Sequence, residues 1–348
     1  MGKAFAEALE RIADGKEPTW GDLTALIEAD EEESVSLFNL ADRVRSRFVG
    51  DGVHFRGIIE FSNYCARNCL YCGLRKNNRD LARYRMSPVE IIEGARRAAA
   101  LGCRTVVLQS GEDGIHTAGV LADIVHTIKR ELGVAVTLSI GDRSRKDYAV
   151  LREAGADRYL LKHETSDARL FATLRPGTTL EGRLRRMGWL RELGYQVGSG
   201  NMVGLPGQTM ESLIGDILLM RRLGVEMAGI GPFIPSALTP LGGVPGGAVE
   251  KVLKTLAVTR LALPHAHLPA TTAAATVDPL GRIKALKCGA NVIMPNMTPL
   301  PYRGDYCIYP GKAELSETPE ESYAKAVRTV ERAGRRVAEG YGYALGST

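Results

Sequence analysis

Short apolar segments alternate with helical patterns along most of this chain, and this alternation limits the possible folds more than any other feature. Eight segments have the length and apolar content of strands: 55–63, 105–111, 135–141, 157–163, 195–204, 226–234, 267–274 and 289–296. Helical patterns lie between them, at 87–102, 117–132, 143–155, 179–193, 209–224, 249–263 and 278–289. A strand followed by a helix about every 30 residues is typical of a parallel sheet.

Eight such units predict an α/β fold of the (β/α)8 TIM-barrel type. The strand segments are continuously apolar, which suits a parallel sheet covered by helices. Gly155, Gly194 and Gly224 follow helical patterns, at positions where a residue that tolerates positive φ ends a helix. An open, doubly wound sheet is the alternative arrangement.

We expect one structural domain with helical extensions at both ends. Residues 1–50 form an N-terminal helical extension, with helices near 20–29 and 33–47, and residues 51–312 form the barrel. Residues 313–348 form a C-terminal helical extension, with a helix over 318–339. No Ser/Gly-rich linker divides the chain, so nothing in the sequence requires a second core.

Composition excludes several classes of protein. Hydrophobic residues make up 45% of the 348 positions and charged residues 24%, the balance of a globular protein. The net charge is +5 with no run of four bases, so we expect no nucleic-acid partner. No stretch of about 18 apolar residues exists, and Glu7 and Glu10 interrupt the N-terminal pattern, so we expect no membrane segment or signal peptide and a cytoplasmic location.

Three of the six cysteines crowd into eight residues. Cys65, Cys69 and Cys72 form a C-x3-C-x2-C pattern immediately after the first predicted strand. Without a secretory signal, such crowding indicates metal ligation or redox chemistry. A [4Fe–4S] cluster normally takes four thiolates, so three local ligands leave one iron open. Structural zinc, which needs four ligands, is the alternative, although His54 lies at the opposite end of the strand.

The cysteine pattern resembles that of the radical S-adenosylmethionine (radical SAM) enzymes, with Tyr71 as the aromatic residue before the third cysteine. The resemblance implies a barrel, one [4Fe–4S] cluster on the three cysteines, and S-adenosylmethionine on the open iron. Reductive cleavage of that cofactor gives a 5′-deoxyadenosyl radical. A radical of this reactivity requires an enclosure that excludes water and holds its target nearest.

The same resemblance implies a set of cofactor contacts. The Glu112 segment and Glu164 are expected to receive the ammonium or ribose, and Arg183 the carboxylate, because a planar guanidinium suits that group. Met202, in a segment similar to the family's adenine-backing element, departs from the usual isoleucine. Each has an ordinary structural alternative, such as a turn or a rim ion pair. The predicted contacts are Tyr71, Glu112, Ser139, Glu164, Arg183 and Met202.

Several longer strings are similar to one branch, the HydE family of [FeFe]-hydrogenase maturases. They include IIEFSNYCARNCLYCGLR, GADRYLLKHET, MVGLPGQT and CGANVIMPNMTPLPYR with YPGK, within residues 5–312. The resemblance implies assembly of the hydrogenase H-cluster, in which the radical attacks the cysteine sulfur of a small Fe(CO)2(CN)–cysteine complex. It also implies a reductant protein, a HydG-like donor and a HydF-like scaffold as partners.

An anionic iron complex requires cations and hydroxyl groups inside the barrel. The candidates for substrate binding are Arg158, Thr271, Thr272, Met294, Arg303 and Tyr306. A buried cation is costly without an anion, but Arg158 has a carboxylate neighbour in Asp157, and the threonines also suit ordinary packing.

Three other functions stay open. A methylornithine synthase-like mutase or a biotin synthase-like enzyme would share the cluster and cofactor, and an iron–sulfur carrier or scaffold would not be an enzyme. Only Cys307 follows Cys288, so we expect no auxiliary C-terminal cluster. The same shortage of thiolates weighs against a biotin synthase-like activity.

Overall fold

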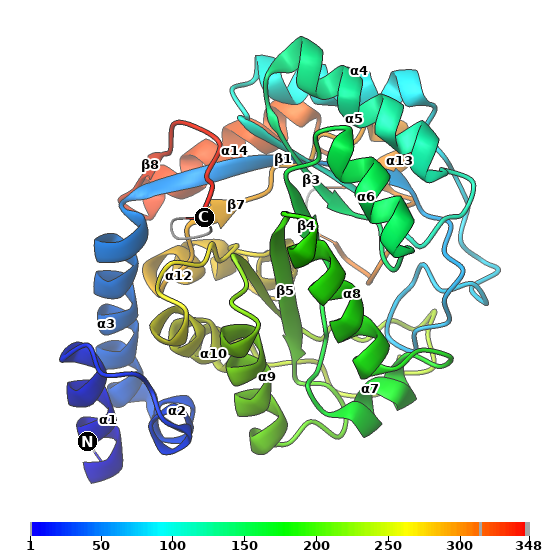
Figure 1. The fold of residues 1–348 in the computed structure, drawn as a ribbon. Helices are drawn as coiled ribbons and strands as arrows, with labels where there is room; N and C mark the ends of the chain where they lie inside the picture. Colours follow the sequence, from blue (N-terminus) through cyan, green and yellow to red (C-terminus); the bar gives the residue numbers. More distant parts are fainter. Residues whose placement is uncertain (1, 313–314, 345–348) are drawn as a thin grey trace.

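A parallel sheet curled into a barrel forms the centre of the molecule (Figure 1). The structure is a computed structural model and describes residues 2–312 and 315–344. Its strands are β1 (Gly52–Ser62), β2 (Thr105–Ser110), β3 (Ala135–Ser139), β4 (Arg158–Leu160), β5 (Gln196–Val203), β6 (Met227–Pro232), β7 (Val292–Ile293) and β8 (Arg336–Val337). The sheet order is β6-β5-β4-β3-β2-β1-β7, and β8 pairs with the start of β1.

Strands β6 and β7 form the two edges of the curled sheet. An extended segment, residues 267–270, lies between these edges and bridges them. Met227 pairs with His267 and Pro269 with Val292, both as isolated parallel bridges. Our prediction of a full strand over 267–274 is therefore wrong in its second half. Pro269 has no N–H to donate, and Thr271 caps a helix that begins at Thr272. The predicted (β/α)8 fold class is confirmed, with its seventh strand reduced to two bridges.

Helices surround this sheet. They are α1 (Lys3–Ala13), α2 (Trp20–Ile27), α3 (Glu31–Val49), α4 (Pro88–Ala100), α5 (Ala118–Leu132), α6 (Arg145–Glu153), α7 (Ala168–Leu174), α8 (Leu180–Glu192), α9 (Met210–Arg222), α10 (Val249–Ala262), α11 (Thr272–Val277), α12 (Gly281–Lys287), α13 (Leu300–Arg303) and α14 (Pro319–Arg332). The predicted helices between strands are all present. The sequence did not predict α7, α11 and α13, because helices this short carry too few turns to produce a periodic apolar stripe.

Local sequence explains where the longer helices begin and end. Ser87 and Ser144 form capping boxes with the acidic residue three positions later, which satisfies free N–H groups at the start of α4 and α6. Just after the C-terminal ends of α6 and α8, Gly155 and Gly194 have φ values of +105° and +80°. Only glycine adopts these values without strain, as the sequence predicted.

The two extensions pack onto the barrel. Helices α2 and α3 lie against α10, and α14 lies against α12 and β8. Residues from all of these parts, such as Phe5, Leu37, Leu253 and Val330, belong to one continuous hydrophobic core. The predicted boundary at residue 313 lies outside the described residues. No helix of the described chain is long and apolar enough to cross a membrane.

Side chains on one face of β1 point into the barrel and those on the other face point toward the helices. Phe55 contacts Tyr323 of α14, and Phe61 contacts His116, which places the odd-numbered positions outside. Since strand residues alternate, the even-numbered positions face inward. The inward-facing residues of β2 and β3 are in register with these even-numbered positions of β1. The inward set includes His54, Arg56, Glu60, Thr105, Gln109, Thr137 and Ser139, so the barrel interior is markedly polar.

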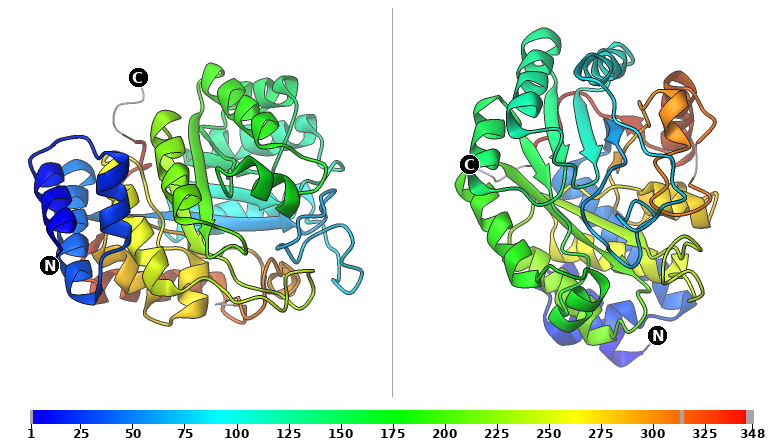
Figure 2. Two further views of the ribbon diagram at one scale, coloured as in Figure 1. Left: turned by 90° about the horizontal axis from the view of Figure 1, so that it is seen from below. Right: turned by 90° about the vertical axis from the view of Figure 1, so that its right-hand side faces the viewer.

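The two ends of the barrel are built differently (Figure 2). The N-terminal helices, β8 and Tyr341 lie at the end where the strands begin. There the backbone oxygen of Tyr341 accepts hydrogen bonds from Arg158 (2.6 Å) and Thr105 (2.9 Å), at the starts of β4 and β2. The loop after β1 lies at the other end, where barrel enzymes carry their chemistry.

Candidate active site

The three cysteines lie in the loop between β1 and α4, at the carboxyl-terminal end of the strands. Cys69 is buried, whereas Cys65 and Cys72 are half-buried. The guanidinium group of Arg83 organises the loop by donating to four backbone carbonyls, those of Asn63, Leu74, Arg75 and Asn78. Loop backbone is thus satisfied internally, which holds the sulfur atoms in place without regular secondary structure.

The surroundings of the sulfur atoms suit bound thiolates. The sulfur of Cys65 accepts the N–H groups of Glu112 (3.4 Å) and Arg67 (3.5 Å), and hydrogen bonds of this kind tune iron–sulfur clusters. Burial raises the pKa of the Cys69 and Cys72 thiols, and the guanidinium of Arg175 partly opposes this effect. Buried thiols of this kind lose their protons when a metal coordinates them.

The two candidate metal groups require different arrangements of their sulfur ligands. Among the described residues, no three His, Cys, Asp or Glu side chains are placed to hold one metal ion. Zinc requires its sulfur ligands about 2.3 Å from a common centre. A cubane places each thiolate on a different iron, so its ligands stand further apart. Three local thiolates match a cluster that leaves one iron open, whereas structural zinc requires a fourth ligand.

A cluster of carboxylate and guanidinium groups borders the cysteine loop. Glu112, which follows β2, accepts from Nε of Arg67 (2.5 Å) and lies 3.4 Å from Arg175. Arg183, on α8, lies 3.9 Å from Glu112 and 3.5 Å from Asp142, which follows β3. The structure thus brings the predicted residues Glu112 and Arg183 together.

Several guanidinium nitrogens in this cluster have no hydrogen-bond partner in the described part of the chain. They are Nε and one terminal nitrogen of Arg183, and Nε of Arg175, although both side chains are over 90% buried. Unsatisfied buried donors are unfavourable unless a ligand completes them. Together with Glu112 and Asp142, they fit a ligand that carries both a carboxylate and an ammonium group.

An apolar surface lies next to this charged cluster. Tyr71 and Met202 pack against a small buried group formed by Leu174, Leu205 and Phe233. The phenol oxygen of Tyr71 accepts a hydrogen bond from Arg175 at 2.9 Å. Burial raises the pKa of Tyr71. Two predicted cofactor contacts therefore share an apolar patch that adjoins the cysteines.

Glu164 has the only left-handed backbone among the described non-glycine residues, with φ of +65°. Its N–H donates to Gly200 (2.9 Å) and its carbonyl accepts from Met202 (3.0 Å), so neighbouring β5 holds the strained conformation. Such strain is concentrated at functional sites. Its carboxylate lies 3.6 Å from the ammonium of Lys162. Ser139, in register with Gln109, lies at the same end of the barrel.

Four of the predicted substrate residues lie at this carboxyl-terminal end. Thr271 caps α11, and the hydroxyl oxygen of Thr272 accepts from Arg282 at 3.0 Å. Met294 follows β7 and is half-buried. Tyr306 is buried beside Gln109 and Glu60, and this burial raises its pKa.

The placements of the two arginines do not support the roles predicted for them. Arg158 begins β4 at the opposite end, where it donates to Tyr341 and lies 4.5 Å from the ring centre of Tyr343. Arg303 is buried and donates to the backbone oxygens of Thr298 (2.7 Å) and Asn296 (2.5 Å). Both guanidinium groups therefore bind the protein's own backbone, which is the usual way to satisfy a buried cation.

Sequence reasoning missed several residues of this site. Arg175 follows α7, a helix too short to be predicted, and Asp142 follows β3 in a short polar turn. Glu60 and Lys162 interrupt apolar strand segments, and that interruption is the signal that could have identified them. A charged or amide side chain on the inner face of a barrel strand requires a partner there.

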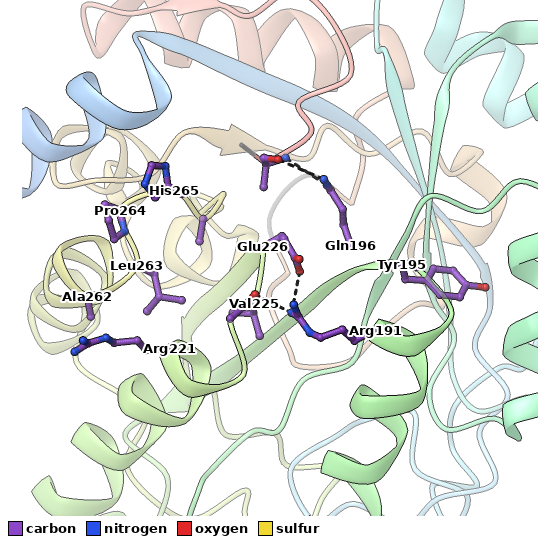
Figure 3. Close-up of a pocket in the computed structure, with 14 residues that line it drawn as sticks. Arg191, Tyr195, Gln196, Arg221, Val225, Glu226, Ala262, Leu263, Pro264 and His265 are labelled. Atoms are coloured by element: carbon purple, nitrogen blue, oxygen red, sulfur yellow. Dashed lines mark hydrogen bonds and ion pairs between the residues drawn. The ribbon is translucent and has the colours of Figure 1, made fainter. Parts of the chain in front are cut away.

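A surface pocket lies elsewhere on the molecule. It has a volume of about 720 Å³ and is bordered by the ends of α8, α9 and α10 and by the starts of β5 and β6 (Figure 3). None of the predicted site residues is among the described residues that line it. Arg191, its most prominent cation, donates to Gly224 (2.7 Å) and lies 3.4 Å from Glu226. We therefore place the candidate active site at the cysteine loop.

Comparisons with known proteins agree with this placement. The model of the radical SAM superfamily matches residues 59–220. The chain is 48% identical over 341 residues to the [FeFe] hydrogenase maturase subunit HydE of Thermotoga maritima, covering 98% of this chain and 97% of that protein. It is 30% identical over 287 residues to 3-methylornithine synthase of Methanosarcina acetivorans, covering 82% and 81%.

A solved structure has the same architecture. The crystal structure of methylornithine synthase (PylB) superposes with a TM-score of 0.84 at 27% identity, covering 95% of this chain and 97% of that one. The identity to HydE extends over nearly the whole chain, beyond the segment that the superfamily model matches. Taken with the cysteine loop and the charged cluster beside it, these similarities establish that the chain belongs to the HydE family of the radical SAM superfamily.

Proposed function

We propose that this protein is a radical SAM maturase that acts in assembly of the [FeFe]-hydrogenase H-cluster. Its substrate would be a small Fe(CO)2(CN)–cysteine complex, attacked at the cysteine sulfur. The observation that carries the proposal is the position of the three cysteines beside two buried guanidinium groups, each with at least one nitrogen that has no hydrogen-bond partner among the described residues. The near-complete coverage of the HydE relative supports the same reading.

Cys65, Cys69 and Cys72 would hold the [4Fe–4S] cluster through three of its irons. When bound, the cluster and S-adenosylmethionine supply a 5′-deoxyadenosyl radical. Arg183 would receive the methionine carboxylate with the two nitrogens that have no hydrogen-bond partner among the described residues, and Glu112 would accept hydrogen bonds from the ammonium.

Tyr71, Met202, Glu164 and Ser139 would complete the cofactor site. Tyr71 and Met202 offer an apolar face to the adenine ring, which excludes water from the reacting atoms. Glu164, held in its left-handed conformation by β5, would accept hydrogen bonds from the ribose, and Ser139 would contribute its hydroxyl. The left-handed backbone of Glu164 sets the direction in which its side chain leaves the chain before the cofactor binds.

The substrate would lie deeper in the barrel, against its polar inner face. Thr271, Thr272, Met294 and Tyr306 lie at the carboxyl-terminal end of the strands and would surround it. Gln109 of β2 and Glu60 of β1 face the same interior, and Lys162, two residues after β4, lies beside Glu164. Cations and hydroxyl groups at these positions suit an anionic complex with a cysteine carboxylate.

Partners follow from the same proposal. An electron must reach the cluster from a reductant protein, and the iron complex must arrive from a HydG-like donor and leave toward a HydF-like scaffold. We also propose that the chain carries a single cluster. Cys103 and Cys288 are 1% exposed and lie in the hydrophobic core, where they behave as small apolar residues.

Complementation tests the proposal. A hydrogenase maturation system that lacks its HydE would receive this protein, reconstituted anaerobically with iron and sulfide, and hydrogen evolution would be measured. We expect hydrogen evolution with the intact protein and none with Cys69→Ala. Protein that carries a cluster and cleaves S-adenosylmethionine, yet fails to restore hydrogen evolution, would contradict the maturase assignment.

The same reconstituted protein can be used to test two alternative functions. The similarity to methylornithine synthase in sequence and fold favours an amino-acid mutase as the second candidate. Incubation with an amino acid isomeric with methylornithine and with S-adenosylmethionine, followed by chromatography coupled to mass spectrometry, would reveal a rearranged product of the same mass at a different retention time. An iron–sulfur carrier would instead bind a cluster but release no 5′-deoxyadenosine under reduction.

A further inference from the structure

A segment distant in sequence covers the cysteine loop. We call residues 305–312 the covering segment. The N–H of Gly73 donates to the carbonyl of Ile308 (2.8 Å), and the side-chain amide of Asn63 donates to the carbonyl of Asp305 (2.8 Å). A Cβ on Gly73 would lie 2.1 Å from the carbonyl oxygen of Cys307. The two backbones are therefore in direct contact next to the third cysteine.

The covering segment ends at a lysine that reaches into the barrel. The ammonium of Lys312 pairs with the carboxylate of Glu60 on β1, and it lies 5.0 Å from the ring centre of Tyr306. The two charged side chains are 5% and 3% exposed. The other oxygen of Glu60 accepts from Asn296 at 3.2 Å. Both charges are thus buried and have defined partners.

The ion pair between Glu60 and Lys312 connects β1 to the end of the covering segment. Glu60 lies on the strand that leads directly into the cysteine loop, whereas Lys312 ends the segment that lies on that loop. Removing one member of a buried ion pair leaves an uncompensated charge, which is strongly unfavourable, while removing both members is much less so. Burial of such a pair fixes one arrangement of the elements that it connects.

We propose that Glu60 and Lys312 are positioning residues that fasten the covering segment against the cysteine loop. In this role they slow the opening of the loop and the loss of iron from the cluster. The inference rests on the proposed assignment of the cluster to Cys65, Cys69 and Cys72. Neither residue needs to contact the cluster, because the covering segment transmits the constraint through Gly73.

The test compares Lys312→Met, Glu60→Gln, the double variant and Lys312→Arg with the full-length wild-type protein. Lys284→Met is the matched control, because Lys284 pairs with Asp278 at 2.7 Å on the surface. In metal-free protein, hydrogen exchange is measured on a peptide containing Gly73. In reconstituted protein, the rate of iron release to a chelator is measured with and without S-adenosylmethionine.

We expect hydrogen exchange at Gly73 and iron release to accelerate at least tenfold in each single variant. In the double variant, the fold-increase in each rate should be smaller than the product of the fold-increases in the two single variants. Lys312→Arg keeps a cation at this position and should have both rates of the wild type. Lys284→Met should also have the wild-type rates. Leu151→Ala, a buried change in α6, controls for general destabilisation. The inference is overturned if Leu151→Ala, at an equal loss of thermal stability, accelerates both rates as much.

The two measurements also separate this inference from the proposed function. Exchange in the metal-free protein depends only on contacts within the chain. If Cys69→Ala retains a full cluster, the cluster assignment fails, and the exchange rates still decide whether the ion pair fastens the loop. Unchanged exchange in both single variants would overturn the positioning role even where iron release is altered.

Discussion

Gly141 lies directly against Glu112, and a Cβ on Gly141 would stand 2.1 Å from Cγ of the glutamate. Gly141 also has φ of +75°, a conformation that favours glycine. Glu112 in turn pairs with Arg67 and Arg175 beside the cysteine loop. A missing side chain on the turn after β3 therefore determines where the carboxylate after β2 lies.

Gly141→Ala should displace Glu112 and weaken binding of S-adenosylmethionine. The clash and the positive φ together are expected to destabilise the protein by about 1–3 kcal/mol. Binding would be measured by calorimetry on the reconstituted protein and stability by thermal unfolding. Gly188→Ala is the control: nothing lies within 4 Å of its Cβ position on α8, so it should be neutral or stabilise by about 0.5–1 kcal/mol. Unchanged binding in Gly141→Ala would contradict a cofactor role for Glu112.

Arg183→Lys should lower affinity for S-adenosylmethionine by about 10–100-fold, the loss expected for a charge-assisted hydrogen bond of 1.5–3 kcal/mol. Lysine keeps the charge but cannot present two parallel N–H groups to a carboxylate. Equilibrium binding provides the measurement. Arg185→Lys, on the exposed side of the same helix and paired with Glu181, should bind as the wild type does. Equal affinities in the two variants would remove Arg183 from the cofactor site.

Cys69→Ala should lose most of its iron after reconstitution, because three ligands cannot be reduced to two without exposing a second iron. Iron and sulfide analysis with electron paramagnetic resonance of the reduced protein would measure the loss. Cys103→Ala is the control, since Cys103 lies in the core beside Gly57, away from the loop. Equal iron contents in the two variants would place the cluster elsewhere.

Stability should fall as the pH is lowered from about 6.5 toward 4, in part because of His54. Burial, reinforced by the charges of Arg56 and Arg158, lowers its pKa to about 4 from the usual 6.5. The unfolded chain therefore takes up a proton in this range that the folded chain does not, which disfavours folding by about 2 kcal/mol at pH 5. Urea unfolding of the wild type and of His54→Gln at pH 7 and pH 5 measures this difference. His54→Gln should lose less stability between the two pH values, and an equal loss would argue against a neutral His54 in the folded state.

The sequence by itself determined the main alternation of strands and helices, the glycines that end helices at Gly155 and Gly194, and the position of the three cysteines after β1. These features depend on periodicity, capping and spacing, which are local properties of the chain. It also placed Glu112, Glu164 and Arg183 at strand ends or on the following helix, because a parallel barrel gathers those ends at one face.

Only the tertiary structure decided which charged groups meet. Arg158 and Arg303 carry charges that suit a substrate, yet they bind the backbone of Tyr341 and Asn296. Arg175, Glu60 and Lys312 gained their partners from residues far away in sequence, such as Tyr71 for Arg175. An unpaired charge is strongly unfavourable when it is buried, so each buried charge must have a partner. The fold decides which groups lie close enough to pair, and this depends on contacts between segments distant in sequence.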